Sequence, residues 1–592
     1  MRLCQIEIEN FKGISSKQTI ELKPITLLFG ANSAGKSTIL HALHYMREVI
    51  ERKNLDPDQT ISGGGIDLGG FKTLVHKHEL NRPIRIKLRL DISEDQGNEH
   101  LQINSGEYFG NDRFAGLEMR YLIGDNYELK ENSLVKSIGV GVEVKWSNLL
   151  NRPIVSKLEI EMDEAPICSL VSDGQPGQAQ LTNFNFNHQQ LRHIRFAEAE
   201  ADADDYEVFS PLIKVITDWS REHAWERIDE KEISEENIRI AVKTNDGAMP
   251  EIMERLQVDT TEDVVENLRN VYKNAVPKQT EDEEYQQRFL ELKEDFLRGP
   301  QNILRQISAM TDFLDEITLG PVRIIREYLK ELTYIGPLRE IPGRNFLPRL
   351  SPDESRWGKG LAAWDLLYSG VDADLLEKVA EWISSEEKLR TGYSLEKSEF
   401  KQIPTDSPIN QAFERGISED DLDYIQDLYM SLKTEINIRL RDLKQNLLVD
   451  ISDVGVGISQ IIPVIVACLM KAKGLISVEQ PELHIHPAIQ VELADLFIQA
   501  TFNDEHSLTT PRSLLIETHS EHIILRLLRR IEETSDGSIP PGKLPLSNTD
   551  VSVIFIDTET NSFKNIAIGK DGEFEDRWPG GFFTERSKEL FS

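Results

Sequence analysis

The segment that most constrains the fold is GANSAGKS at residues 30–37, which lies between an apolar run and an amphipathic segment. Residues 25–29 (ITLLF) are typical of a buried strand, and residues 38–50 are typical of a helix. The pattern GxxxxGK[ST] in this strand–loop–helix context indicates a phosphate-binding loop, because glycines let backbone N–H groups point at phosphate and the helix N-terminus adds a positive dipole end. The sequence therefore predicts an α/β nucleotide-binding fold.

The loop supplies the first group of candidate site residues. We expect Lys36 to reach the β- and γ-phosphates of ATP and the Ser37 hydroxyl to hold Mg²⁺. The candidate nucleotide-binding residues here are Gly30, Asn32, Ser33, Ala34, Gly35, Lys36, Ser37 and Thr38.

A second apolar strand, residues 475–478 (LISV), ends in Glu479, Gln480, Pro481 and Glu482. An apolar strand that ends in a carboxylate after a phosphate-binding loop is the Walker B arrangement, in which the acid holds the Mg²⁺ water shell. Glu479 is therefore the candidate metal residue beside Ser37. Two histidines follow in LHIHP, but positions i and i+2 do not share a helix face and no third ligand is near, so this pattern does not favour zinc.

Two further segments complete the candidate site. A third strand, residues 513–516, is followed by Glu517, Thr518 and His519, and a histidine at this strand end can reach a γ-phosphate, although a lone histidine is more often structural. Residues 453–460 (DVGVGISQ) lead into a helix, which predicts a second anion-binding N-terminus or a simple cap by Ser459. These two interpretations of the glycine segment are compatible.

The remaining chain is interpreted by its periodicity. Short alternating segments over residues 84–186 predict an antiparallel, β-rich extension, and the next part is mostly helical and acidic. Polar helices predicted at residues 261–276 and 281–314 favour a short arm, since no heptad is sustained long enough for a long coiled coil. The predicted divisions are 1–85 (N-terminal ATPase lobe), 86–186 (β-rich extension), 187–447 (mainly helical insertion), 448–545 (C-terminal ATPase lobe) and 546–592 (C-terminal cap).

Composition limits the partners and the compartment. The 592 residues carry 67 basic and 101 acidic side chains, a net charge of −34, which does not favour direct nucleic-acid binding. The most apolar window, residues 458–470, contains Pro463 and is too short to span a membrane. Three widely spaced cysteines are typical of a reduced, cytoplasmic protein.

The motifs IEIENFKGI, GANSAGKST, DVGVGISQ, VEQPELHIHP and IETHSEH, in this order, resemble the SMC/RecF/OLD-like branch of ABC-type ATPases, often described as AAA-family ATPases and common in prokaryotic antiviral defence and DNA repair. The ending RWPGGFFTERSKEL is similar to a C-terminal domain of unknown function in this group. The resemblance covers residues 1–85 and 448–545. It implies an α/β P-loop ATPase head, a mixed sheet with flanking helices, split by a β-rich and a large helical insertion. It also implies that Gly455, Gly457, Ser459 and Gln460 cap ATP bound to a second subunit.

The chain departs from the family in two places. Gln480 stands where the family usually has a catalytic glutamate, so Glu479, Gln480, Glu482 and His519 are the catalytic candidates. No convincing Q-loop is present, and Gln59 and Asp67 are only weak candidates.

Two other patterns bear on nucleic-acid chemistry. Only 73 residues follow His519, and Asp557 and Glu559 are typical of a hairpin rather than of a nuclease site. A basic segment is interpreted as a return to the ATPase core, with nucleic-acid contact as the alternative; its members are Arg323, Arg326, Lys330, Arg339, Arg344 and Arg349.

These features predict a slow ATPase that uses ATP and Mg²⁺ and acts as a nucleotide-gated switch. The resemblance implies a homodimer with ATP between its heads, or a higher oligomer, which controls a separate nuclease or toxin in a defence complex. A RecF/SMC-like ATPase that clamps DNA and an OLD-like nuclease are the alternatives.

Overall fold

The computed structural model describes residues 1–31, 35–57, 66–93, 135–172, 174, 179–183, 185, 188, 240–242, 318–344, 346–349, 355–416, 422–471, 474–502, 512–557 and 562–578. Several predicted features lie outside these residues. They are Asn32, Ser33 and Ala34 of the loop, Gln59, Glu559, the acidic stretch 197–207, the helices predicted at 261–276 and 281–314, and the tail after residue 578.

A six-stranded sheet forms the centre of the molecule. Its order is β10-β14-β15-β3-β16-β17, and its first five strands run parallel. Every residue of β3, β14 and β15 is buried, as expected for parallel strands that are covered on both faces. The strands are β10 (Thr333–Ile335), β14 (Leu475–Glu479), β15 (Ser513–Glu517), β3 (Ile25–Gly30), β16 (Val551–Asp557) and β17 (Ser562–Ile566). This mixed α/β arrangement confirms the predicted fold class.

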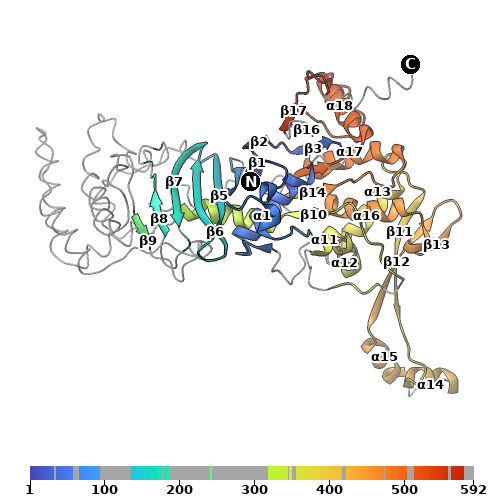
Figure 1. Ribbon diagram of the computed structural model, residues 1–592. Helices are drawn as coiled ribbons and strands as arrows, with labels where there is room; N and C mark the ends of the chain where they lie inside the picture. The colour runs from blue at the N-terminus through green and yellow to red at the C-terminus, as the bar shows by residue number, and fades with distance from the viewer. Residues whose placement is uncertain are drawn as a thin grey trace, which may run out of the picture.

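An antiparallel, eight-stranded sheet lies beside this centre (Figure 1). Its order is β2-β1-β4-β5-β6-β7-β8-β9. The predicted division at residue 85 falls inside β4, so strands on both sides of that division belong to one sheet. The strands are β1 (Arg2–Glu9), β2 (Gln18–Glu21), β4 (Ile84–Asp91), β5 (Ser137–Ser147), β6 (Arg152–Met162), β7 (Ala165–Ser172), β8 (Ala179–Thr182) and β9 (Ile240–Val242).

Alternating side chains of the central sheet point into two hydrophobic clusters. Leu28 of β3 packs with α1 (Ser37–Ile50), the helical residues 318–330 and the eight-stranded sheet. Leu27 and Phe29 pack with the opposite layer. That layer contains α12 (Leu361–Ser369), α13 (Ala373–Ser384), α16 (Val456–Leu469), α17 (Pro487–Phe502) and α18 (Glu521–Ser535). Because β3 is packed on both faces, the loop that follows it starts from a strand end that is held in place.

A narrow arm projects from the molecule (Figure 1). Strands β11 (Tyr393–Lys401) and β12 (Thr434–Asp442) pair antiparallel, and β13 (Leu447–Val449) pairs with β12. The helices α14 (Pro408–Arg415) and α15 (Leu422–Ser431) form the tip of the arm, and α15 has no buried residue. Among the described residues, the segment predicted as mainly helical (187–447) thus also contains β9, β10, β11 and β12.

The shorter helical elements are α2 (Phe71–Leu74), η2 (His76–His78), α11 (Ser355–Gly358) and η6 (Ile451–Asp453). No helix within the described ranges has the length and apolarity required to cross a membrane.

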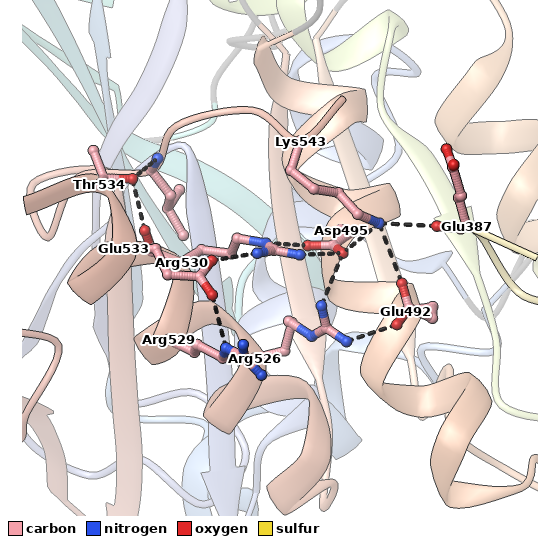
Figure 2. Close-up of polar contacts among 10 residues, drawn as sticks. Glu387, Glu492, Asp495, Arg526, Arg529, Arg530, Glu533, Thr534 and Lys543 are labelled. Atoms are coloured by element: carbon pink, nitrogen blue, oxygen red, sulfur yellow. Dashed lines mark hydrogen bonds and ion pairs between the residues drawn. The ribbon is translucent and has the colours of Figure 1, made fainter. Parts of the chain in front are cut away.

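A buried ion network joins α17 to α18 (Figure 2). Arg530 of α18 donates to both carboxylate oxygens of Asp495 of α17, at 2.8 and 2.9 Å, and also pairs with Glu533. Lys543, in the loop after α18, lies 2.9 Å from the Asp495 carboxylate. Arg526 bridges Asp495 and Glu492. These contacts fix α17, which precedes β15 in the chain, against α18, which follows it.

Candidate functional site

The predicted site residues gather at one edge of the central sheet. In the parallel pair of β14 and β15, Glu479 lies directly beside Glu517, and both residues end their strands. Strand β3 ends at Gly30 next to β15, and α1 begins at Ser37. Ligands bind at the carboxyl ends of strands in α/β sheets, so this edge is the candidate nucleotide site.

Lys36 is buried under the loop, with a side chain only 4% exposed. Its ammonium donates to the carbonyl oxygens of Gly30 (3.2 Å) and Ala31 (2.9 Å) and lies 3.8 Å from Glu517 Oε1. Burial lowers the pKa of this lysine, while Glu517 opposes the shift. The ammonium therefore lies against the backbone at the end of β3.

Gly35 shows why the loop needs a glycine just before this lysine. Its φ is +90°, in the region that side chains rarely adopt, and an added Cβ would lie 3.3 Å from Thr38 Oγ1. The described end of the loop thus has the tight turn that a phosphate-binding loop requires.

The Ser37 hydroxyl faces two carboxylates. It donates to Glu517 Oε2 at 2.7 Å, and Glu479 Oε2 lies at 3.5 Å. Glu479 is the carboxylate that the sequence proposes for the metal, and it lies at the end of β14. Glu517 was not among the predicted site residues, although it ends a buried strand two positions before His519, and that placement is a signal that could have revealed it.

Burial and mutual repulsion set the charge state of this carboxylate pair. Burial and the neighbouring Glu517 raise the pKa of Glu479 to about 7, even though it accepts a hydrogen bond from the Tyr334 hydroxyl at 3.0 Å. Burial also raises the pKa of Glu517, against the effects of Ser37 and Lys36. The two carboxyls therefore ionise less readily than free ones, and a cation bound at this edge would favour their ionised form.

Glu482 contacts the turn after β15. Its Oε1 accepts the backbone N–H of His519 at 2.7 Å, and its Oε2 accepts the Thr518 hydroxyl at 2.8 Å. With both oxygens occupied, Glu482 holds the His519 turn in place. Nε2 of His519 is buried and has no hydrogen-bond partner among the described residues. Burial and the nearby Lys36 lower the pKa of this histidine, so the ring is neutral and its tautomer is set by its contacts.

Gln480 lies in the left-handed region, with φ of +44°, immediately after β14. Its backbone N–H donates to the Glu517 carbonyl at 2.7 Å, which ties the two strand ends together. The chain therefore turns sharply immediately after the end of β14.

The glycine segment forms the N-terminus of α16, but its four candidate residues differ in exposure. Gly455, the N-cap residue, is exposed, and Gly457 is partly exposed. Ser459 is 1% exposed and donates to the Val456 carbonyl at 2.9 Å. The Gln460 side chain is buried against the backbone of Arg339. Only the glycine end of the segment therefore faces outward.

Arg339 holds the elements of the site together and was not predicted as a site residue. Its guanidinium donates to the carbonyl of Glu479 (2.7 Å) and lies 3.3 Å from that of Gln480 and 3.4 Å from that of Gln460. Burial lowers its pKa to about 10.

Other members of the basic segment also make internal contacts. Arg344 pairs with Asp453 at 2.9 Å, and Lys330 pairs with Glu327 at 2.7 Å. These contacts favour the structural interpretation of the segment over nucleic-acid contact.

The remaining sequence candidates are placed as follows. His486 accepts the backbone N–H of Ala488 at 3.2 Å, and no group of three metal-binding side chains occurs within the described ranges. Asp67 accepts the N–H of Gly69 in its own turn. Asp557 pairs with Lys564 across the β16–β17 hairpin at 2.8 Å.

The sequence model of the family described as "AAA ATPase domain" matches residues 1–312, and a second, described as "AAA domain, putative AbiEii toxin, Type IV TA system", matches residues 255–525. No curated protein matches.

Solved structures with distant similarity include an Smc head domain from Pyrococcus furiosus bound to the C-terminal domain of ScpA (11% identity, TM-score 0.31, all of both chains covered). An SMC head domain from Thermotoga maritima has 8% identity and a TM-score of 0.30, with 96% of this chain and 100% of that chain covered. The first family model spans more than half of the 592 residues and includes the loop, Lys36 and Ser37. The chain belongs to the AAA ATPase domain family.

Proposed function

We propose that this chain binds ATP with Mg²⁺ at the edge of the central sheet, hydrolyses it slowly, and works as a dimeric, nucleotide-gated switch. The observation that carries the proposal is the meeting of Lys36, the Ser37 hydroxyl and two carboxylates beside His519 Nε2, a buried ring nitrogen without a partner among the described residues. A buried polar atom without a partner costs free energy unless a ligand supplies one.

The donor set fits Mg²⁺, which prefers hard oxygen ligands and keeps several waters. Ser37 and Glu479 would hold the ion, which would supply positive charge to neutralise the charge that develops on the phosphates. Lys36 would bind the β- and γ-phosphates. His519 Nε2 would contact the γ-phosphate, and Glu482 would keep that ring in place.

Slow turnover follows from Gln480. Its amide can orient a water molecule through its carbonyl oxygen but cannot take a proton at neutral pH, and a positioned base contributes roughly 10²–10⁴-fold. Glu482 is a poorer candidate for the base, because each of its oxygens already accepts a hydrogen bond, from Thr518 or from His519, and these bonds fix its orientation. A long-lived ATP state suits a switch better than a motor.

Dimerisation follows from the exposed N-terminus of α16. This 14-residue helix has Gly455 and Gly457 at its N-terminal end, which favours anions. The chain's own phosphate-binding loop leads into a different helix, α1. In a two-fold dimer each α16 would cap the ATP of the other subunit, so that closure needs two chains.

The role in a defence complex rests on the resemblance and on the second family description, which names a toxin–antitoxin system. The partner would be a separate effector, a nuclease or a toxin. The net charge of −34 disfavours a surface that clamps DNA.

The experiment measures ATP binding and ATP-dependent association. Lys36→Ala removes the cation aimed at the phosphates and should weaken ATP binding by about tenfold or more, equivalent to about 1.4 kcal/mol. Unchanged ATP affinity in this variant would remove the site assignment.

Association is tested best at Gly455. An added Cβ there meets nothing within 4 Å, whereas one at Gly457 would lie 2.6 Å from the His484 carbonyl and disturb the fold. Gly455→Asp should keep ATP binding but lose the ATP-dependent dimer in light scattering. The matched control Gly455→Ala should still dimerise. A Gly455→Asp protein that dimerises with ATP like the wild type would refute the capping role.

A further inference from the structure

Glu517 lies where an additional ligand of the metal would lie. Adjacent, in-register residues of parallel strands point to the same side of the sheet, so Glu479 and Glu517 present their carboxylates at one level. The Ser37 hydroxyl, which the fold offers to the metal, hydrogen-bonds Glu517 at 2.7 Å, whereas Glu479 lies at 3.5 Å. The side chain of Glu517 thus stands closer to Ser37 than does the predicted metal carboxylate.

The backbone of Glu517 is fixed from both sides. Its carbonyl accepts the N–H of Gln480 at 2.7 Å, and the next residue, Thr518, donates its N–H to Leu28 of β3 at 3.1 Å. The side chain is 7% exposed. A carboxylate held this rigidly is preorganised for a ligand, and the adjacent turn at Gln480 cannot move without breaking these contacts.

The nearby cations do not satisfy the carboxylate pair. Lys36 lies 3.8 Å from Glu517 and gives its two hydrogen bonds to loop carbonyls. The Arg339 guanidinium donates to backbone carbonyls of this edge. The ammonium of Lys12 contacts Nδ1 of His41 at 2.5 Å. Two buried carboxylates beside one shared ammonium leave negative charge that a divalent cation would neutralise.

We propose that Glu517 is a second metal-holding carboxylate, which binds Mg²⁺ together with Glu479 and the Ser37 hydroxyl. This inference rests on the proposed function and assigns a residue to the same site. Mg²⁺ is commonly bound through one or two carboxylates plus phosphates, and three protein oxygens leave room for both phosphates and waters.

The test uses the full chain, Mn²⁺ as the probe and a non-hydrolysable ATP analogue. Bound and free Mn²⁺ are separated by electron paramagnetic resonance. Glu517→Gln should raise the Kd for Mn²⁺ in the analogue complex by about 10- to 100-fold or more, since loss of a group that only orients a metal ligand already costs about that much. Glu479→Gln should act similarly. The control Glu399→Gln, which removes a carboxylate from the exposed arm, should leave the Kd unchanged.

Binding of the analogue in EDTA shows that each variant is folded and separates the two hypotheses. A wild-type protein that does not bind the analogue at all would overturn the proposed function. A Glu517→Gln protein that binds the analogue in EDTA and takes up Mn²⁺ like the wild type would overturn only the role of Glu517. The same conclusion would follow if the wild type bound the analogue equally well with and without the metal. Glu517→Asp retracts the carboxylate but keeps its charge and should give an intermediate Kd.

Discussion

Two clusters of charged side chains, each with buried carboxylates, differ in how their charges are balanced. In the network between α17 and α18, four cations meet three carboxylates (Figure 2). At the edge of the central sheet, Glu479, Glu482 and Glu517 meet Lys36, and the nearby arginine binds carbonyls. Both clusters have buried carboxylates, so burial alone does not distinguish them.

The directions of the pKa shifts do distinguish them. Burial would raise the pKa of Asp495, but its bonds to Arg530 and Lys543 lower it. Burial does raise the pKa of Glu479 and of Glu517, because the opposing contacts are too few. A balanced cluster stabilises the fold, whereas an unbalanced one is held by the rest of the fold and is suited to a charged ligand.

The largest expected change in the free energy of unfolding comes from removing a cation from the ion network between α17 and α18. Arg530, whose side chain is 2% exposed, neutralises Asp495 and Glu533. Arg530→Met would leave two buried carboxylates short of a partner, and breaking a buried pair in this way costs about 3–5 kcal/mol. Urea unfolding of the nucleotide-free protein should show this loss.

Arg529→Met is the matched control, one position away on the same helix. Arg529 is 65% exposed and also pairs with Glu533, at 2.8 Å. Exposed pairs contribute roughly 0–1 kcal/mol, so this variant should be nearly as stable as the wild type. Equal losses in the two variants would contradict the distinction between buried and exposed members of the network.

A somewhat smaller effect is expected from pH. The pKa of Glu479 is raised from its ordinary 4.5 to about 7, so the folded state binds its proton more tightly than the unfolded state. At about 1.4 kcal/mol per pKa unit, this carboxyl lowers the free energy of unfolding by about 3 kcal/mol as pH rises from 4.5 through 7. Asp495 acts in the opposite direction, since its lowered pKa gives stability that is lost only when pH falls below 3.8.

Unfolding of the nucleotide-free protein at several pH values tests this sign. Glu479→Gln should become more stable than the wild type as pH increases from 5 to 8, because the variant lacks the titrating group. A difference between the two proteins that is constant with pH would show that Glu479 is ionised throughout.

The sequence predicted the parts of this site that are local in the chain. Strand β3, the loop end at Gly35 and Lys36, and the start of α1 follow from one motif, and Glu479 and His519 follow from apolar strands that end in a polar residue. These parts could be predicted because a buried parallel strand is recognisable in the sequence as a short, continuous apolar run.

The remaining parts depend on contacts between distant segments. The end of a buried strand marks Glu517 as a candidate, but only the register of β14 and β15 places it beside Glu479, and neither strand sequence specifies that register. Arg339 belonged to a basic segment that also fitted nucleic acid, and only its bonds to the carbonyls of α16 and β14 show its structural use. The joining of β4 to β5 in one sheet likewise depends on pairing across residues 94–134.

The smallest expected effect in free energy concerns Gln480. It tests whether an added carboxylate at this edge of the central sheet lowers the stability of the protein while it raises ATP turnover. Gln480→Glu adds another carboxylate to an edge that already has excess negative charge, so the nucleotide-free protein should lose stability. If Gln480 occupies the position of the base, steady-state phosphate release should rise by about 10²-fold, equivalent to about 2.7 kcal/mol. The control Glu482→Gln keeps its shape, and its amide can accept from the His519 N–H and donate to the Thr518 hydroxyl, so turnover should be nearly unchanged. The reverse pattern, in which Glu482→Gln abolishes hydrolysis and Gln480→Glu has no effect, would assign the base to Glu482 and remove the reason for slow turnover.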